Sequence, residues 1–254
     1  MVGTPAAGVP ELEVSEEVTA CILHRVESPD VNSELAEHRV DYSDAGLDAA
    51  DLAPAPLEQF HRWWDEASSD PRIAEPNAVV LATVDAGGLP DARTVLLKGA
   101  DARGFVFYTN LGSAKARQLA AAPHAALVLP WHPQQRQVRV RGEVEQVSRD
   151  ESAAYFATRP RGSQLGAHAS RQSAEVASRE DLARAYEAAA ARFPEPGAVP
   201  LPDGWGGFLV RPVEVELWVG RRSRLHDRLV YLSVTGEPAP LDDAGAWRVV
   251  RRQP

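Results

Sequence analysis

The sequence of 254 residues contains a single cysteine, Cys21. One cysteine excludes an intrachain disulfide framework and any zinc site built from cysteine pairs, and it fits a reducing compartment, so we expect a cytoplasmic protein. The seven histidines show no HExxH spacing, so no metal site is predicted. The GxSxG elbow of serine hydrolases and the GxxxxGK loop of nucleotide-binding proteins are also absent from the sequence.

Long hydrophobic runs and an excess of positive charge are lacking too. Near the N-terminus the longest uncharged apolar run is Val18 to Leu23, which is too short to cross a bilayer and has no basic region before it. We therefore expect no signal peptide. The formal net charge of -9 and the pI near 5.3 argue against sequence-independent nucleic-acid binding. The arginines and lysines are therefore expected to act at local sites.

What the chain does have is enough apolar sequence for a sizeable core, with 44% hydrophobic residues. Residues 1–37 are rich in Pro, Ala, Val and Glu. For them we predict a mostly disordered acidic extension, or the product of a start codon placed too early. The segment that follows places Arg39, Asp41 and Tyr42 together just ahead of a loop, a pattern that also fits an ordinary surface segment.

Hydrophobic periodicity predicts a mainly β protein with packed helices. Leu57, Phe60, Trp63, Trp64 and Ala67 recur at helical spacing, so an amphipathic helix with a core-facing aromatic side is expected there. From Ala78 onward the period changes to two. Strands are predicted at 78–84, 93–98, 105–110, 124–131, 135–147, 208–210, 213–219, 226–234 and 247–250, helices after Ser148 and Ser178, and a loop at 194–207. Short connections favour an antiparallel barrel of roughly six to eight strands with helices outside.

The first candidate site is the hairpin Arg93 to Asn110 and the helix start behind it. Ser113 is placed as a helix N-cap, so free backbone N–H groups are expected beside Lys115, which outlines an anion site. An ordinary solvated edge with basic residues explains the same pattern. Arg93 and Lys98 are five residues apart, so both can serve one ligand only if the strand bends or bulges.

Two further stretches concentrate cations. Tyr155 to Ser173 gathers arginines, serines and glutamines, which suits an oxyanion such as phosphate and equally fits a solvated helix connection. Arg224, His226 and Arg228 are two apart, so on a strand they are expected to face one side, toward an anionic ligand or an acidic partner strand. Together these features indicate an enzyme or binder for ligands with two separate phosphates, whose electron chemistry belongs to a cofactor.

Six motifs in this order resemble the pyridoxine/pyridoxamine 5′-phosphate oxidase family. The motifs are RTVLLK (93–98), FYTNLGSAK (107–115), PWHPQQRQVRVRG (130–142), RPRGSQLGAHASRQS (159–173), PLPDGWGG (200–207) and VELWVGRRSRLHDR (215–228). The resemblance runs from about Arg39 to the C-terminus and implies a single domain at 38–254. It implies an FMN-binding split β-barrel, active as a homodimer, that oxidises pyridoxamine or pyridoxine 5′-phosphate to pyridoxal 5′-phosphate. Electrons then pass to O2 with release of hydrogen peroxide.

The resemblance also implies roles for individual residues. The FMN site is expected to contain Arg93, Thr94, Val95, Leu96, Leu97, Lys98, Tyr108, Thr109, Lys115, Gln137, Gln172, Ser173, Trp218 and Arg228, some of them from the second subunit. The substrate phosphate is expected at Lys98, Tyr155, Arg159 and Ser163. Arg224 and His226 are implied to be catalytic and to lie over the pyridine ring, and Arg39 with Tyr42 to form part of a closing lid.

The sequence departs from the family pattern at a few positions. Ala114 stands where the family often has a basic residue beside the FMN phosphate, and His168 replaces a common Trp, which we interpret as a packing substitution. Two other functions are kept as hypotheses. One is a related split-barrel flavin enzyme, such as the phenazine-pathway relatives, acting on another ring system. The other is a non-catalytic protein that binds pyridoxal phosphate or flavin.

Overall fold

The computed structural model describes residues 31–38, 40–43 and 45–254. The chain divides into two units, Met1–Val40 and Asp41–Pro254. In the first unit the described residues form helix α2 (Val31–Glu37). Residues 1–30 of the predicted acidic extension, and the predicted lid residue Arg39, lie outside the described residues, so these predictions stay untested.

The second unit is built from eight strands and several short helices. Its strands are β1 (Ala78–Val84), β2 (Pro90–Asp101), β3 (Gly104–Asn110), β4 (His124–Trp131), β5 (Arg136–Gln146), β6 (Trp205–Val219), β7 (Asp227–Ser233) and β8 (Trp247–Arg252). Its α-helices are α3 (Pro56–Ser69), α4 (Ala114–Ala121), α5 (Arg149–Thr158), α6 (Arg161–Ala169) and α7 (Arg179–Arg192). Short 3-10 turns lie at η1 (Ala49–Asp51), η2 (His132–Gln134), η3 (Arg222–Arg224) and η4 (Ala244–Ala246).

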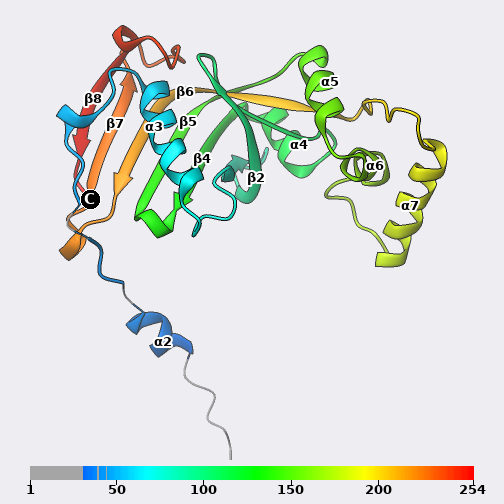
Figure 1. The fold of residues 1–254 in the computed structure, drawn as a ribbon, viewed down its shortest axis with the longest axis horizontal. Coiled ribbons are helices and arrows are strands. Elements are labelled where there is room, and N and C mark those ends of the chain that lie inside the picture. Colours follow the sequence, from blue (N-terminus) through cyan, green and yellow to red (C-terminus); the bar gives the residue numbers. More distant parts are fainter. Residues whose placement is uncertain (1–30, 39, 44) are drawn as a thin grey trace, which may run out of the picture. The chain divides into compact units, whose positions relative to one another are not determined.

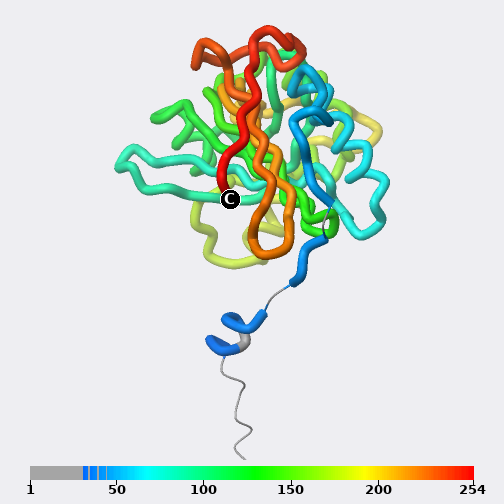
Figure 2. Tube along the Cα trace, turned by 90° about the vertical axis from the view of Figure 1, so that its left-hand side faces the viewer, coloured from blue at the N-terminus to red at the C-terminus, as the bar shows by residue number. Residues whose placement is uncertain are grey.

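The strands close into an antiparallel barrel. They follow the order β3-β2-β1-β4-β5-β6-β7-β8, and an additional β3–β6 pairing joins the first strand to the sixth. Strand β6 therefore serves two purposes, because its first half pairs with β3 and its second half with β7. Strands β7 and β8 continue the sheet beyond the barrel, as the orange and red segments of Figures 1 and 2 show. The predicted fold class, an antiparallel barrel with packed helices, is confirmed.

A register shift between β5 and β6 lies where β6 changes its pairing from β3 to β7. The register between the two strands shifts at Arg141/Gly142. A Cβ atom added to Gly142 would lie 2.1 Å from the carbonyl oxygen of Arg211, so only glycine allows the two backbones to approach this closely.

Alternating side chains fill the barrel. Leu81, Leu127 and Leu129 are fully buried in one core cluster with aromatic residues of β3 and β4. Helix α3 packs its aromatic side against this core, as predicted, with the rings of Phe60 and Phe105 edge to face at 5.0 Å. Figure 1 shows α3 lying across the strands. Truncating such a buried ring to alanine typically costs about 3–5 kcal/mol.

Helices α5, α6 and α7 gather beyond one end of the barrel around a smaller cluster of Phe156, Leu165, Val199 and Trp205 (Figure 1). The predicted caps are confirmed, since the Ser148 hydroxyl accepts from Glu151 N at 3.0 Å and the Ser178 hydroxyl accepts from Asp181 N at 3.0 Å. No helix of the described residues is both long and apolar enough to cross a membrane.

Two sequence predictions about local structure were wrong, and a third stretch that the sequence left open is now defined. The strands expected at 208–210 and 213–219 are one strand that begins at Trp205, inside the expected loop, because Pro212 is tolerated where the β5–β6 register shifts. Helix α6 occupies the stretch that sequence alone left open as a helix connection. Arg224 lies in turn η3 with φ of 61°, so Arg224, His226 and Arg228 do not share one strand face.

Candidate active site

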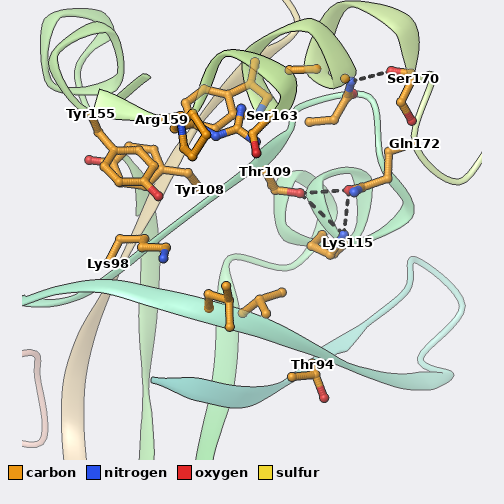
Figure 3. A pocket seen from close by; sticks show the side chains of 17 residues that line it. Thr94, Lys98, Tyr108, Thr109, Lys115, Tyr155, Arg159, Ser163, Ser170 and Gln172 are labelled. Carbon is orange, nitrogen blue, oxygen red and sulfur yellow. Dashed lines mark hydrogen bonds between the residues drawn. The ribbon is translucent and has the colours of Figure 1, made fainter. Parts of the chain in front are cut away.

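A cavity of about 590 Å³ opens between strands β2 and β3 and helices α5 and α6. Its volume lies within the range of small-molecule sites, roughly 300–1,000 Å³. Eleven of the predicted site residues line it: Thr94, Val95, Leu96, Lys98, Tyr108, Thr109, Lys115, Tyr155, Arg159, Ser163 and Gln172. Residues that are distant in sequence therefore meet at one place (Figure 3).

Lys98 and two tyrosines form one end of this cavity. The Tyr108 and Tyr155 rings stack at 4.2 Å with an interplanar angle of 15°. Lys98 lies on the strand face shared with Thr94 and Leu96, within the β2–β3 register shift between Leu97 and Gly99. Figure 3 shows its amine on the same side of the cavity as the tyrosines. Lys98 forms no ion pair with a carboxylate of the described residues, so its charge is available to a ligand.

Arg159 and Ser163 lie beside this end, where α5 stops and α6 starts. Arg159 is the C-cap of α5 and Pro160 the N-cap of α6, which has no side-chain cap at its N-terminus. The first N–H groups of α6 and the positive end of its dipole thus lie next to Ser163. Arg159 Nη1 is buried with no hydrogen-bond partner among the described residues. Burial lowers the pKa of Arg159, which indicates a desolvated cation in need of an anion.

Lys115 forms the opposite end of the cavity. Ser113 caps α4 as predicted, its hydroxyl accepting from Ala116 N at 3.4 Å. Lys115 is only 8% exposed, and its Nζ donates to Gln172 Oε1 at 2.8 Å and to Thr109 Oγ1 at 3.4 Å. Burial and the nearby charge of Arg93 lower the pKa of Lys115. An anion bound near Lys115 would act in the opposite direction and raise its pKa.

Three predicted FMN residues lie next to this cavity without lining it. Arg93 points away from the face of Lys98, as strand alternation predicted, and donates to Gln118 Oε1 at 3.0 Å. It also forms an ion pair with Asp91. Leu97 belongs to the barrel core. The Ser173 hydroxyl accepts from the backbone N–H of Ala114 at 3.1 Å, so Ser173 is held at the start of α4.

A second group of predicted residues lies across β5, β6 and β7. Gln137 is opposite Trp218, and Trp218 is opposite Arg228, so the three form one cross-strand row. The ring of Tyr42 packs edge to face on Trp218 at 5.9 Å and on His226 at 5.5 Å. None of these residues lines the cavity of the same chain.

The partners of Arg228 and His226 restrict what each side chain can do. Arg228 donates from Nε and Nη2 to the Glu216 carboxylate, at 3.1 and 2.9 Å. The acidic partner strand that sequence reasoning left open is therefore present. Nδ1 of His226 accepts from Arg221 N at 3.0 Å, while burial and the charge of Arg224 lower the pKa of His226. The catalytic pair predicted from the sequence thus combines an imidazole whose Nδ1 already accepts a hydrogen bond with an exposed arginine.

Comparison with known proteins identifies the family. Residues 66–192 match the family model for pyridoxamine 5′-phosphate oxidase, and residues 205–254 match the model for the C-terminal dimerisation region of pyridoxine 5′-phosphate oxidase. The chain belongs to the pyridoxamine 5′-phosphate oxidase family. Two curated relatives are named pyridoxine/pyridoxamine 5′-phosphate oxidase. The one from Streptomyces avermitilis is 50% identical over 86% of this chain and 96% of its own length. The one from Thermobifida fusca is 52% identical over 87% of this chain and 99% of its own.

Solved structures of the same fold extend the comparison. The structure of PhzG from Burkholderia lata 383, in complex with tetrahydrophenazine-1-carboxylic acid, is 28% identical with a TM-score of 0.72 and covers 84% of this chain and 100% of its own. An FMN binding protein from Nostoc punctiforme, related to pyridoxamine 5′-phosphate oxidase, is 20% identical with a TM-score of 0.62 and covers 80% of this chain and 100% of its own. The similarity to the Nostoc punctiforme protein shows only that the two chains share a fold.

Within this oxidase family the His168 substitution has a structural explanation. Nε2 of His168 lies 2.8 Å from the carbonyl oxygen of Pro200, and its ring packs on Phe193 at 4.6 Å. These contacts join α6 to the loop before β6, so the interpretation of His168 as a packing residue is confirmed.

Sequence reasoning missed several residues that line the cavity. They are Asn110, Pro160, Gly166, Ala167 and Trp205, whereas Ser170 belongs to the serines of the candidate stretch Tyr155 to Ser173. Trp205 stood inside one of the family motifs, PLPDGWGG, and was assigned to a loop. The motif could have identified Trp205 as a site residue. The position of its ring, however, depends on contacts with β3 and α5, which a local sequence pattern cannot predict.

Proposed function

We propose that the protein oxidises pyridoxamine 5′-phosphate or pyridoxine 5′-phosphate to pyridoxal 5′-phosphate, with FMN as cofactor and O2 as electron acceptor. The observation that carries this proposal is a single cavity with unneutralised cations at two separate ends. Lys98 and Arg159 lie at one end, and the buried Lys115 lies at the other. Two phosphorylated ligands, a cofactor and a substrate, are what such a cavity is suited to hold. The curated relatives with the oxidase name support the same reaction.

The residues present fit FMN at the Lys115 end. Lys115, Thr109 and Gln172 form a connected polar group. No carboxylate of the described residues pairs with the ammonium, and a phosphate would supply the anion. Strand β2 contributes Thr94, Val95 and Leu96 along the cavity wall, where they would hold the ring system. When bound, FMN supplies a hydride acceptor at N5 and returns the electrons to O2.

The opposite end then holds the substrate by its phosphate. Arg159 offers a buried donor without a partner, Ser163 and the start of α6 offer short-range donors, and Lys98 adds a second charge. A phosphate anchored here fixes the reactive C4′ carbon in position, so the hydride transfer becomes effectively intramolecular. The stacked Tyr108 and Tyr155 rings exclude water from this wall.

We propose a homodimer in which the second group of residues completes the site of the other copy. The match of residues 205–254 to a dimerisation region supports this assembly, and that region contains Trp218, Arg224, His226 and Arg228. His226 would donate from Nε2 to the substrate ring, because its Nδ1 already accepts a backbone N–H. Arg224 is exposed on its turn, where it is accessible to a ligand held by another subunit. A cytoplasmic location is proposed from the single cysteine.

The direct test is an assay of the purified protein loaded with FMN. Incubation with pyridoxamine 5′-phosphate in air should yield pyridoxal 5′-phosphate and hydrogen peroxide in equal amounts. Absence of both products, with this substrate and with pyridoxine 5′-phosphate, would contradict the proposed activity.

A second candidate reaction is oxidation of another ring system, since the solved structure of PhzG holds a phenazine carboxylic acid. The two candidate substrates differ in the anionic group that they would bring to Arg159 and Lys98. A ligand with one carboxylate would leave one of these cations without an anion, so the geometry favours the phosphorylated vitamin. Turnover of a reduced phenazine carboxylic acid at a higher kcat/KM than the vitamin would reverse this preference.

A further inference from the structure

The guanidinium of Arg159 lies over two aromatic rings. Its guanidinium carbon lies 4.8 Å from the centroid of the Trp205 ring and 5.4 Å from that of Phe156. Cation–π attraction at these separations is favourable, and it is stronger for Trp than for Phe and stronger when the cation is desolvated. Arg159 is therefore held on the face of an aromatic ring.

No carboxylate of the described residues forms an ion pair with Arg159, and its Nη1 has no hydrogen-bond partner among them. Other arginines of the chain differ. Arg228, for example, donates two hydrogen bonds to Glu216. A carboxylate that orients an arginine also neutralises it, whereas an aromatic ring orients the guanidinium and leaves both its positive charge and its N–H groups available.

Trp205 is itself fixed from several sides. It is 5% exposed, stacks on Tyr108 at 5.4 Å with an interplanar angle of 4°, and meets Phe156 edge to face at 5.1 Å. Its carbonyl oxygen accepts from Arg149 Nη1 at 2.9 Å. Gly207 makes room for the neighbouring Tyr108 ring, since a Cβ there would lie 2.6 Å from it. The Trp205 ring is therefore held in place by packing on several sides.

We propose that Trp205 is a positioning residue for Arg159 and thereby sets the preference of the cavity for phosphorylated over unphosphorylated ligands. This inference rests on the proposed function, because it takes the cavity to bind the phosphorylated vitamin. Trp205 itself lines the cavity, yet its contribution to phosphate binding is made through the arginine that it supports.

The test is a double-mutant cycle on binding of pyridoxal 5′-phosphate to the FMN-loaded protein, measured by calorimetry. Trp205→Leu should weaken binding about tenfold, and Trp205→Phe, which keeps a ring face, should weaken it about threefold. In an Arg159→Gln background Trp205→Leu should cause no further loss. Binding of pyridoxal, which lacks the phosphate, should be unchanged within about twofold in all variants.

Trp247→Leu is the matched control, because Trp247 is 7% exposed and packs in the barrel core. It should lower Tm without changing the ratio of the two affinities. Equal weakening of pyridoxal and pyridoxal 5′-phosphate by Trp205→Leu, or additive losses in the cycle, would overturn the positioning role.

The outcomes separate this inference from the proposed function. If the wild-type protein binds pyridoxal 5′-phosphate and the variants show the predicted coupling, but no peroxide is produced, the positioning role of Trp205 is supported and the oxidase activity is contradicted. If the wild-type protein turns over normally but the losses in the double-mutant cycle are additive, the oxidase activity is supported and the positioning role of Trp205 is contradicted. Absence of any binding of pyridoxal 5′-phosphate to the wild type overturns both.

Discussion

The backbone N–H of Arg221 donates a hydrogen bond of 3.0 Å to Nδ1 of His226. The bond spans the turn that carries Arg224, so it couples the two residues predicted to be catalytic. It also requires an unprotonated Nδ1, which leaves the proton of the neutral ring on Nε2. Burial and the positive charge of Arg224 act in the same direction by lowering the pKa of His226.

The first prediction concerns pH. If Nε2–H of neutral His226 contacts the substrate, kcat/KM should hold at neutral pH and fall as the pH drops through the His226 pKa, which lies below its ordinary value of about 6.5. His226→Asn should lower kcat/KM at pH 7 by roughly tenfold or more and should abolish this acid limb. The pH dependence of kcat/KM, measured for the wild type and for His226→Asn, tests this prediction. His61→Asn, an exposed position on α3, is the control, and an unchanged acid limb in His226→Asn would refute the assignment.

The second prediction concerns Lys115. Replacement by Met removes the buried cation from the end of the cavity assigned to FMN, so affinity for FMN should fall by roughly 10- to 100-fold, the value of a charge-assisted hydrogen bond. Riboflavin, which lacks the phosphate, should bind the variant and the wild type equally. Quenching of flavin fluorescence by the apoprotein measures both affinities.

Arg117→Met is the control for Lys115→Met, since Arg117 is an exposed cation on the same helix and does not line the cavity. It should leave FMN affinity within about twofold of the wild type. If Lys115→Met weakens riboflavin as much as FMN, Lys115 does not contact the phosphate.

The third prediction concerns the buried carboxylate of Glu216. Its side chain is 2% exposed and accepts from Arg139 and Arg228. Glu216→Gln leaves Arg228 without a carboxylate among the described residues, while Arg139 keeps its ion pair with Glu214. The free energy of unfolding should therefore fall by about 3 kcal/mol. Denaturant unfolding followed by circular dichroism measures it.

Glu145→Gln is the comparison for Glu216→Gln, because Glu145 lies on the adjacent strand and forms an exposed ion pair with Arg211 at 3.5 Å. Its effect should stay below about 1 kcal/mol. Similar losses of unfolding free energy in the two variants would show that burial does not increase the contribution of the ion pairs around Glu216 to stability.

The fourth prediction concerns Gly142. A Cβ atom there would lie 2.1 Å from the Arg211 carbonyl oxygen, so Gly142→Ala should force β5 and β6 apart and lower the free energy of unfolding by about 3 kcal/mol or more. Gly204→Ala meets no atom within 4 Å and serves as the control in the same unfolding measurement. A Gly142→Ala protein as stable as Gly204→Ala would show that the strand crossing tolerates a side chain.

The structure also shows why some features were predictable from the sequence and others were not. Strand alternation in β1 to β4 and the caps at Ser113, Ser148 and Ser178 depend on neighbouring residues only, and they were predicted correctly. The gathering of Lys98, Arg159 and Lys115 around one cavity was implied by resemblance to a family, since no spacing reports contacts between β2, α4 and α5.

The failures follow from long-range structure in the same way. Strand geometry was assumed for Arg224, but Ser223 and Arg224 adopt positive φ values of 57° and 61° without a glycine to signal the turn. The partner of Arg228 lies on the neighbouring strand β6. The sequence favoured an anionic ligand and kept an acidic strand as the alternative, because no local pattern shows which strands become neighbours. Trp205 gains its position through the β3–β6 pairing and through contacts with helix α5, which are distant in the sequence.

The central claim is that this cavity holds a flavin and a phosphorylated vitamin together in reactive contact. Anaerobic mixing of the FMN-loaded protein with pyridoxamine 5′-phosphate tests it most directly, because no step after hydride transfer contributes to the signal. The account predicts that the flavin absorbance bleaches in a single turnover and that pyridoxal 5′-phosphate forms in an amount equal to the FMN present. An oxidised flavin spectrum that persists in the presence of saturating pyridoxamine 5′-phosphate would contradict it.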